Sequence, residues 1–158
     1  MKTGIIGWRG MVGSVRLQRM RQEGDFEGLD ASFFSTSSPG KAGPDVGAGS
    51  APLLDAHDIA ALATHDVLVS CQGGSYTKAV HPALRSAGWD GIWIDAASAL
   101  RMRDDATLIL DPVNGPSVKQ AITDGGRIFV GANCTVSLMI MGMACLLYTS
   151  DAADDLYR

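Results

Sequence analysis

The sequence predicts an α/β domain in which a doubly wound, mostly parallel sheet carries helices on both faces. Short apolar segments alternate with helix-like segments along the chain, and the apolar segments are continuous rather than alternating with polar residues. Continuous apolar strands of this kind are typical of parallel sheets that are buried on both faces. At 158 residues, of which 46% are hydrophobic, the chain is large enough to bury the core of one ordinary domain.

The expected elements follow one another in a regular order. Strands are expected at 3–6, 30–34, 67–70, 92–95, 108–110 and 128–131, and helices up to about 23, at 76–87, after 114 and at 138–147. A loop over 37–52, rich in Gly, Pro, Ser and Ala, either folds over a ligand or is mobile. In the first helix, the apolar face is expected to contain Val12, Val15, Leu17 and Met20. The arginines expected to lie toward solvent are Arg16, Arg19 and Arg21.

A glycine-rich turn joins the first strand to the first helix. Its glycines, Gly7, Gly10 and Gly13, have the spacing G-x-x-G-x-x-G. Strand, glycine turn and helix in this order are typical of a Rossmann-like dinucleotide fold, in which the helix N-terminus faces the pyrophosphate. The alternative is a turn that only packs the helix against the strand.

The end of the second strand indicates which nucleotide is bound. Sites for NAD usually carry a carboxylate about 20 residues past the glycines, which accepts hydrogen bonds from the ribose. Here the strand leads into the hydroxyls of 35–38 and then Lys41, without a carboxylate. Hydroxyls and a cation tolerate a 2′-phosphate, so NADP is favoured over NAD, although such a segment is also typical of a simple polar turn.

A candidate nucleophile lies near the end of the chain. Cys134 follows the strand 128–130 and Gly131-Ala132, at the start of a helix-like run. The unpaired amides of a helix N-terminus favour the thiolate, and Asn133 and Thr135 suit capping. A buried structural cysteine, which would sit more comfortably within a strand, is the alternative; Cys71, directly after the strand 67–70, is interpreted in that way.

Several classes of function are disfavoured by composition. A net charge of −4 gives no reason to expect nucleic acid binding. The absence of a signal peptide or a long apolar run predicts no membrane span, and three cysteines without paired spacing favour a reducing cytoplasm over a disulfide framework. No metal site is expected, because the histidines at positions 57, 65 and 81 are scattered.

Six motifs, taken together and in order, resemble one enzyme family. They are Gly7-Trp8-Arg9-Gly10-Met11-Val12-Gly13, Phe33-Phe34-Ser35-Thr36-Ser37, Cys71-Gln72-Gly73-Gly74, Trp93-Ile94-Asp95-Ala96-Ala97-Ser98 with Leu100-Arg101-Met102, Asp111-Pro112-Val113-Asn114, and Asn133-Cys134-Thr135. Over residues 1 to about 144 the chain is similar to aspartate-semialdehyde dehydrogenases, most closely the type of Gram-negative bacteria. The close runner-up is N-acetyl-glutamyl-phosphate reductase, which resembles that family in fold and in its cysteine chemistry.

The resemblance implies a reductive dephosphorylation. Members of the family convert aspartyl phosphate and NADPH to aspartate semialdehyde and phosphate, on the route to lysine, methionine and threonine, and are dimers or tetramers. By this resemblance Cys134 forms a thioester with the substrate, and Arg101 binds its phosphate. The positions that match cofactor contacts are Arg9, Gly10, Met11, Val12, Thr36, Ser37 and Gln72.

The last residues do not follow the family. We expect a nucleotide-binding domain over 1–144 and a foreign tail over 145–158, because one codon choice for 145–150 reproduces a transposon-end adapter of sequencing libraries. A natural, divergent C-terminus is the alternative. The family's general-base histidine, its substrate-carboxylate arginine and its second domain have no counterpart here, so no dehydrogenase turnover is expected from this chain. A free-standing nucleotide-binding module is the competing interpretation.

Overall fold

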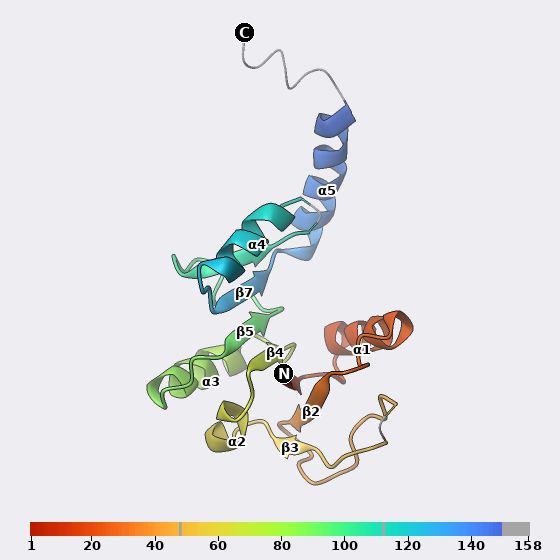
Figure 1. Ribbon diagram of the computed structural model, residues 1–158, viewed down its shortest axis with the longest axis vertical. Coiled ribbons are helices and arrows are strands. Elements are labelled where there is room, and N and C mark those ends of the chain that lie inside the picture. Colours follow the sequence, from red (N-terminus) through yellow and green to blue (C-terminus); the bar gives the residue numbers. More distant parts are fainter. Residues whose placement is uncertain (48, 112, 150–158) are drawn as a thin grey trace.

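The computed structural model describes residues 1–47, 49–111 and 113–149. Within these residues, seven strands form one parallel sheet in the order β3-β2-β1-β4-β5-β7-β6 (Figure 1). The strands are β1 (Lys2–Ile6), β2 (Asp30–Ser35), β3 (Leu54–Asp55), β4 (Val67–Ser70), β5 (Ile92–Asp95), β6 (Ala106–Ile109) and β7 (Ile128–Gly131). The predicted Rossmann-like α/β fold is therefore confirmed.

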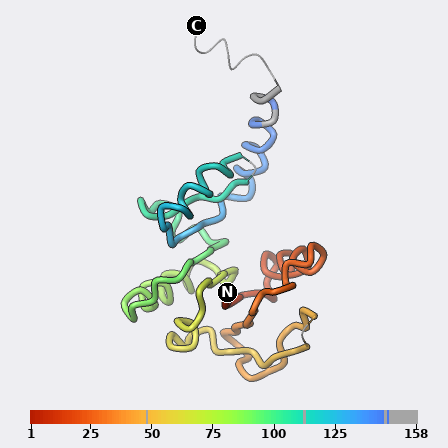
Figure 2. Tube along the Cα trace, in the orientation of Figure 1, coloured from red at the N-terminus to blue at the C-terminus, as the bar shows by residue number. Residues whose placement is uncertain are grey.

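The strand order reverses beside the first strand. The chain builds β1, β2 and β3 outward, then returns to place β4 on the other side of β1, so that β1 lies in the interior of the sheet (Figure 2). In open α/β sheets such a reversal leaves a crevice at the carboxyl ends of the two strands, where ligands bind. The fold thus predicts a ligand site beyond Ile6 and Ser70.

Helices cover both faces of this sheet. They are α1 (Met11–Glu23), α2 (Ile59–Ala63), α3 (Gly74–Ser86), α4 (Gly115–Thr123) and α5 (Cys134–Thr149). In Figure 1, α1 lies on one face, α2 and α3 lie on the other, and α5 extends away from the sheet.

Two hydrophobic clusters form the core, one on each face. Successive side chains of a strand point to opposite faces, and accordingly Ile5 and Phe33 belong to one cluster while Ile6 and Phe34 belong to the other. The second cluster is the larger and surrounds the fully buried Trp93. This division explains why the strands read as continuous apolar runs.

The predicted apolar face of α1 is only partly correct. Leu17 is buried, but Val12 and Val15 are 56% and 57% exposed. The helix approaches the glycine turn through Gly13, where an added Cβ would lie 2.2 Å from the Gly7 carbonyl oxygen. Position 17 lies within about 40° of position 13 around the helix, whereas positions 12 and 15 lie about 100° or more away, so their side chains face outward.

The other expected elements begin and end within about two residues of their predicted bounds, except for α5, but β3 and α2 were not expected. The last helix begins at Cys134 instead of position 138, and it continues to Thr149. Of the expected tail, 150–158 lie outside the described residues. Among the helices of the described chain, none combines the length and apolar character that crossing a membrane requires.

Candidate functional site

A cavity of about 320 Å³ lies where the strand order reverses. Three turns line it, at the carboxyl ends of β1, β2 and β4. They bring together five of the predicted cofactor-contact residues: Arg9, Gly10, Thr36, Ser37 and Gln72. Residues from three motifs that are well separated in the sequence thus share one site.

The glycines of the first turn are required by close backbone approaches. Gly7 has a φ of 75°, and a Cβ there would lie 2.6 Å from the Gln72 backbone nitrogen. Helix α1 begins after Gly10 with no side-chain cap, so the amide groups of its first turn remain available. Available amides at a helix N-terminus, beside a turn without obstructing side chains, fit a pyrophosphate group.

Two of the predicted cofactor-contact residues lie outside the lining of the cavity. The side chains of Met11 and Val12 do not line the cavity, and Met11 is 85% exposed. Both residues lie in the first turn of α1, where only their backbone N–H groups are placed to face an anion.

Side-chain hydrogen bonds connect the three turns that line the cavity. The Arg9 Nη2 donates a hydrogen bond to Ser35 Oγ at 3.0 Å, and Gln72 Nε2 donates to Thr36 Oγ1 at 3.3 Å. Ser35 Oγ also accepts from the backbone N–H groups of Ser37 and Ser38, at 3.3 and 3.1 Å. Ser35 was not predicted as a site residue, although a serine that ends a strand before a polar turn commonly bonds to the turn backbone in this way.

The charge of this cavity comes from Arg9. No Asp or Glu is among the lining residues, as expected from the end of β2. Lys41, which was expected to supply a nearby cation, does not line the cavity. The lining therefore offers hydroxyls and a guanidinium to a bound group.

Cys71 lies differently from its expected place in the core. It is only partly buried, and it lines the cavity beside Gln72. Burial raises the pKa of the Cys71 thiol, and the adjacent Arg16 guanidinium lowers it by less. Arg16 is therefore not directed to solvent as expected: α1 presents it toward the turn after β4.

The Cys134 turn lies at the same edge of the sheet, beyond β7. Cys134 is the first residue of α5 and is exposed, and Asn133 Oδ1 accepts the Val136 N–H at 3.1 Å as a helix cap. The predicted capping by Asn133 is thus present. Arg101, which follows β5, donates from Nε to the Gly131 carbonyl at 2.8 Å and from Nη2 to the Ala132 carbonyl at 3.3 Å.

Strand spacing relates the two parts of the site. Only β5 lies between β4, which ends at the cavity, and β7, which ends before Cys134. At the usual distance between neighbouring strands, β4 and β7 are therefore about 10 Å apart. A nucleotide bound along the carboxyl edge could therefore extend from the glycine turn toward the thiol.

A buried carboxylate supports the loop between these two parts. Asp95 Oδ2 accepts from Thr77 Oγ1 at 2.7 Å and from Trp93 Nε1 at 3.2 Å, and Oδ1 accepts from the Ala97 N–H at 2.8 Å. Asp95 is 1% exposed, so these bonds replace the water that its charge would otherwise require. The carboxylate thereby holds the start of the loop after β5 in place.

The histidines take no part in the site. His65 and His81 are buried, and His81 makes an edge-to-face contact with Trp93, with ring centres 5.4 Å apart. Burial lowers the pKa of His81 to about 4. In the described residues no group of three His, Cys, Asp or Glu side chains could hold a metal ion.

Comparisons with known proteins agree with this geometry. A model of the semialdehyde dehydrogenase NAD-binding domain matches residues 2–121. Aspartate semialdehyde dehydrogenase from Francisella tularensis is 50% identical, with a TM-score of 0.82 over 88% of this chain and 38% of that one.

More distant structures share the fold. Aspartate semialdehyde dehydrogenase II of Vibrio cholerae, complexed with ASA, is 18% identical, with a TM-score of 0.72 over 92% of this chain and 46% of that one. The Candida albicans enzyme with NADP is also 18% identical, with a TM-score of 0.65 over 93% and 46%. The chain spans less than half the length of each of these structures. It belongs to the semialdehyde dehydrogenase family and carries an NAD-binding domain like that of the aspartate semialdehyde dehydrogenases.

Proposed function

We propose that residues 1–144 are the NADP-binding part of an aspartate semialdehyde dehydrogenase. The complete enzyme would reduce aspartyl phosphate to aspartate semialdehyde and phosphate, in the cytoplasm, on the route to lysine, methionine and threonine. The observation that carries the proposal is the position of the nucleotide cavity and the Cys134 turn at one edge of the sheet, separated by β5.

The cavity lining supports NADP over NAD. A 2′-phosphate would be repelled by a carboxylate and attracted by a guanidinium. The lining contains no carboxylate, and Arg9 lies within hydrogen-bond distance of Ser35 at the end of β2, where the ribose binds in folds of this type. Thr36 and Ser37 add hydroxyl groups that can donate to the phosphate.

The thiolate of Cys134 is the proposed nucleophile. Its sulfur attacks the acyl carbon of aspartyl phosphate, the bond to the phosphate oxygen breaks, and phosphate leaves with the electron pair. The product is a thioester on Cys134. NADPH, when bound, supplies the hydride that reduces this thioester, after which the aldehyde departs and the thiolate is restored. Arg101 is the proposed partner of the phosphate, because a guanidinium binds phosphate oxygens well.

A further domain is part of the proposal. Along α5 several large apolar side chains are exposed, among them Val136, Leu138, Met139 and Met143. In the complete enzyme we expect another domain or subunit to cover them and to supply a general base and a group for the substrate carboxylate. The 158-residue chain alone should then bind nucleotide without dehydrogenase turnover.

The test is a chimera of two enzymes. Residues 1–144 replace the matching part of the Francisella tularensis enzyme, which is 50% identical over 88% of this chain. The chimera should reduce NADP with aspartate semialdehyde only when phosphate is present. Cys134→Ser should abolish this activity, while Arg19→Gln, which alters an exposed ion pair with Glu23 outside the cavity, should retain most of it.

Three results would contradict the proposal. A chimera that binds NADP but shows no phosphate-dependent turnover would favour a nucleotide-binding module without catalysis. Turnover that persists in Cys134→Ser would exclude the proposed nucleophile. Turnover with N-acetylglutamate semialdehyde instead of aspartate semialdehyde would assign the chain to the related reductase.

A further inference from the structure

The side chain of Arg101 spans the turn that carries Cys134. Its Nε donates to the Gly131 carbonyl oxygen at 2.8 Å, and its Nη2 donates to the Ala132 carbonyl oxygen at 3.3 Å. The guanidinium of Arg101 therefore binds two successive carbonyl groups of the turn through two neighbouring nitrogen atoms. Only a guanidinium offers donors in such a fixed arrangement.

The loop that presents Arg101 is itself anchored. It leaves β5 at Asp95, whose buried carboxylate accepts the Ala97 N–H at 2.8 Å, and the Arg101 N–H donates to the Ser98 carbonyl at 3.2 Å. The carboxyl ends of β5 and β7 are level, since Asp95 pairs with Val130. A side chain on this loop thus reaches the turn after β7 from a backbone that the core holds in place.

The Cys134 turn has few other restraints. Beyond β7, Asn133 caps α5 through the Val136 N–H, and the Cys134 side chain is exposed. Among the described residues, the nearest atoms to a Cβ built at Gly131 are the Asp95 carbonyl oxygen at 3.7 Å and the Ala96 Cα at 4.0 Å. Gly131 also pairs with Ile109 at the end of β7, so the contacts of Arg101 add to one strand pairing and to the Asn133 cap.

We infer that Arg101 is a positioning residue that fixes the turn before Cys134 through the Gly131 and Ala132 carbonyls, in addition to its proposed contact with phosphate. The inference rests on the proposed role of Cys134 as the nucleophile. In the described part of the chain Nη1 has no hydrogen bond, so it remains available to a phosphate oxygen while the other two nitrogens hold the turn. One side chain then links the position of the phosphate to that of the thiol.

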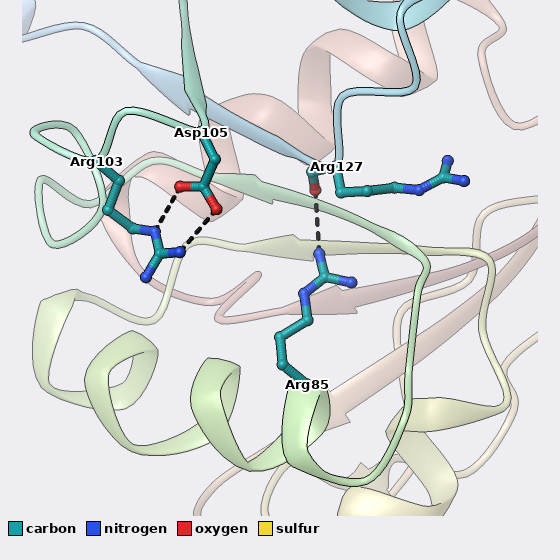
Figure 3. Close-up of polar contacts among 4 residues, drawn as sticks. All are labelled: Arg85, Arg103, Asp105 and Arg127. Atoms are coloured by element: carbon teal, nitrogen blue, oxygen red, sulfur yellow. Dashed lines mark hydrogen bonds and ion pairs between the residues drawn. The ribbon is translucent and has the colours of Figure 1, made fainter.

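The test separates the shape of Arg101 from its charge. Arg101→Lys keeps the charge but cannot bond both carbonyls as a fork, and Arg101→Gln removes the charge. Arg103→Lys is the matched control, because Arg103 lies two residues away and pairs with Asp105 through both carboxylate oxygens at 2.7 Å (Figure 3). Hydrogen exchange of 131–136 and iodoacetamide labelling of Cys134 relative to Cys71 are measured in the complete chain, without cofactor or substrate.

Both Arg101 variants should exchange the amides of 131–136 about tenfold faster or more, as expected when two hydrogen bonds are lost. Exchange of 92–95 should not change, which shows that the sheet is intact. The labelling ratio should fall about threefold or more in both variants, because the thiol leaves its place at the helix N-terminus. Arg103→Lys should resemble the unmodified chain in both measurements.

Three results would overturn the inference. If Arg101→Lys shows the same amide exchange and the same labelling ratio as the unmodified chain, the charge of Arg101 is sufficient to hold the turn and its two-donor geometry is not needed. If exchange rises but the labelling ratio stays constant, Arg101 stabilises the turn without positioning the thiol. If neither quantity changes in either variant, the two carbonyl contacts have no effect. Failure of the proposed nucleophile is distinct, since it appears in the unmodified chain as Cys134 labelling no faster than Cys71.

Discussion

The contact of Arg9 with the end of β2 leads to a quantitative prediction about nucleotide choice. Its Nη2 donates to Ser35 Oγ at 3.0 Å, and its guanidinium lies 5.2 Å from the centre of the Trp8 ring. These two contacts hold the charge at the cavity, where we place the 2′-phosphate of NADP. Arg9→Gln keeps a side chain that can bond to Ser35 but removes the charge.

The magnitude follows from the exposure of Arg9. A hydrogen bond between charged groups contributes about 1.5–3 kcal/mol, and exposure to solvent reduces this value. Arg9 is exposed, so we expect a loss of about 1–2 kcal/mol, which is an increase of about 5- to 30-fold in the Kd of NADPH. The Kd of NADH should not change, because NADH has no 2′-phosphate. The difference in the Kd of NADPH between Arg9→Gln and the unmodified chain should become smaller as salt is added.

Isothermal titration calorimetry of the complete chain with each nucleotide measures both constants. Arg19→Gln is the control, since Arg19 lies on α1, the helix that follows the Arg9 turn, and pairs only with exposed groups, Glu23 at 2.9 Å among them. Equal weakening of NADPH and NADH binding by Arg9→Gln would refute the reasoning, because Arg9 would then contact a part that both nucleotides share. An unchanged Kd for NADPH would refute it as well.

Three further predictions concern stability. Because the pKa of His81 is lowered from 6.5 to about 4, the unfolded chain binds this proton and the folded chain does not. The free energy of unfolding should therefore fall by up to about 3 kcal/mol as the pH decreases from 6.5 to 4. Denaturant titrations at each pH should show a smaller decrease in the free energy of unfolding for His81→Phe. An equal dependence of this free energy on pH in both proteins would contradict the assignment to His81. Asp95→Asn leaves one acceptor oxygen for three buried donors, and should lower the free energy of unfolding by about 2–4 kcal/mol; urea denaturation showing a loss below 1 kcal/mol would count against the network. Gly13→Ala places a Cβ 2.2 Å from the Gly7 carbonyl oxygen and should cost about 1–3 kcal/mol and weaken NADP binding, whereas Val15→Ala, at an exposed position of the same helix, should do neither.

Much of the fold could be predicted because its strands are buried on both faces. Continuous apolar runs such as 67–70 and 128–130 have a strong local signal, and the structure places β4 and β7 there. The face of α1 could not be predicted from apolar spacing, since the close approach of Gly13 to Gly7 orients that helix. Hydrophobicity alone carries no information about a contact between two backbones.

The separate motifs of the site could be predicted from the sequence, but the contacts between these motifs could not. The glycine turn and the polar end of β2 were each recognisable, while the bond between Arg9 and Ser35 depends on the pairing of Ile6 with Phe34. The contact of Arg101 with the Gly131 carbonyl likewise depends on β5 pairing with β7, although β6 lies between them in the sequence. Pairing between distant strands is a property of the whole sheet, so local patterns do not specify it.

The most direct test of the account is an NMR titration of the isotope-labelled chain with NADP. The central claim is that the turns at 7–12, 35–37 and 71–73 form one nucleotide site. We predict saturable shifts of the backbone amides in those three segments, and weaker shifts under the same concentrations of NAD. Saturable shifts confined to other parts of the sheet, or no saturation with either nucleotide, would contradict the claim.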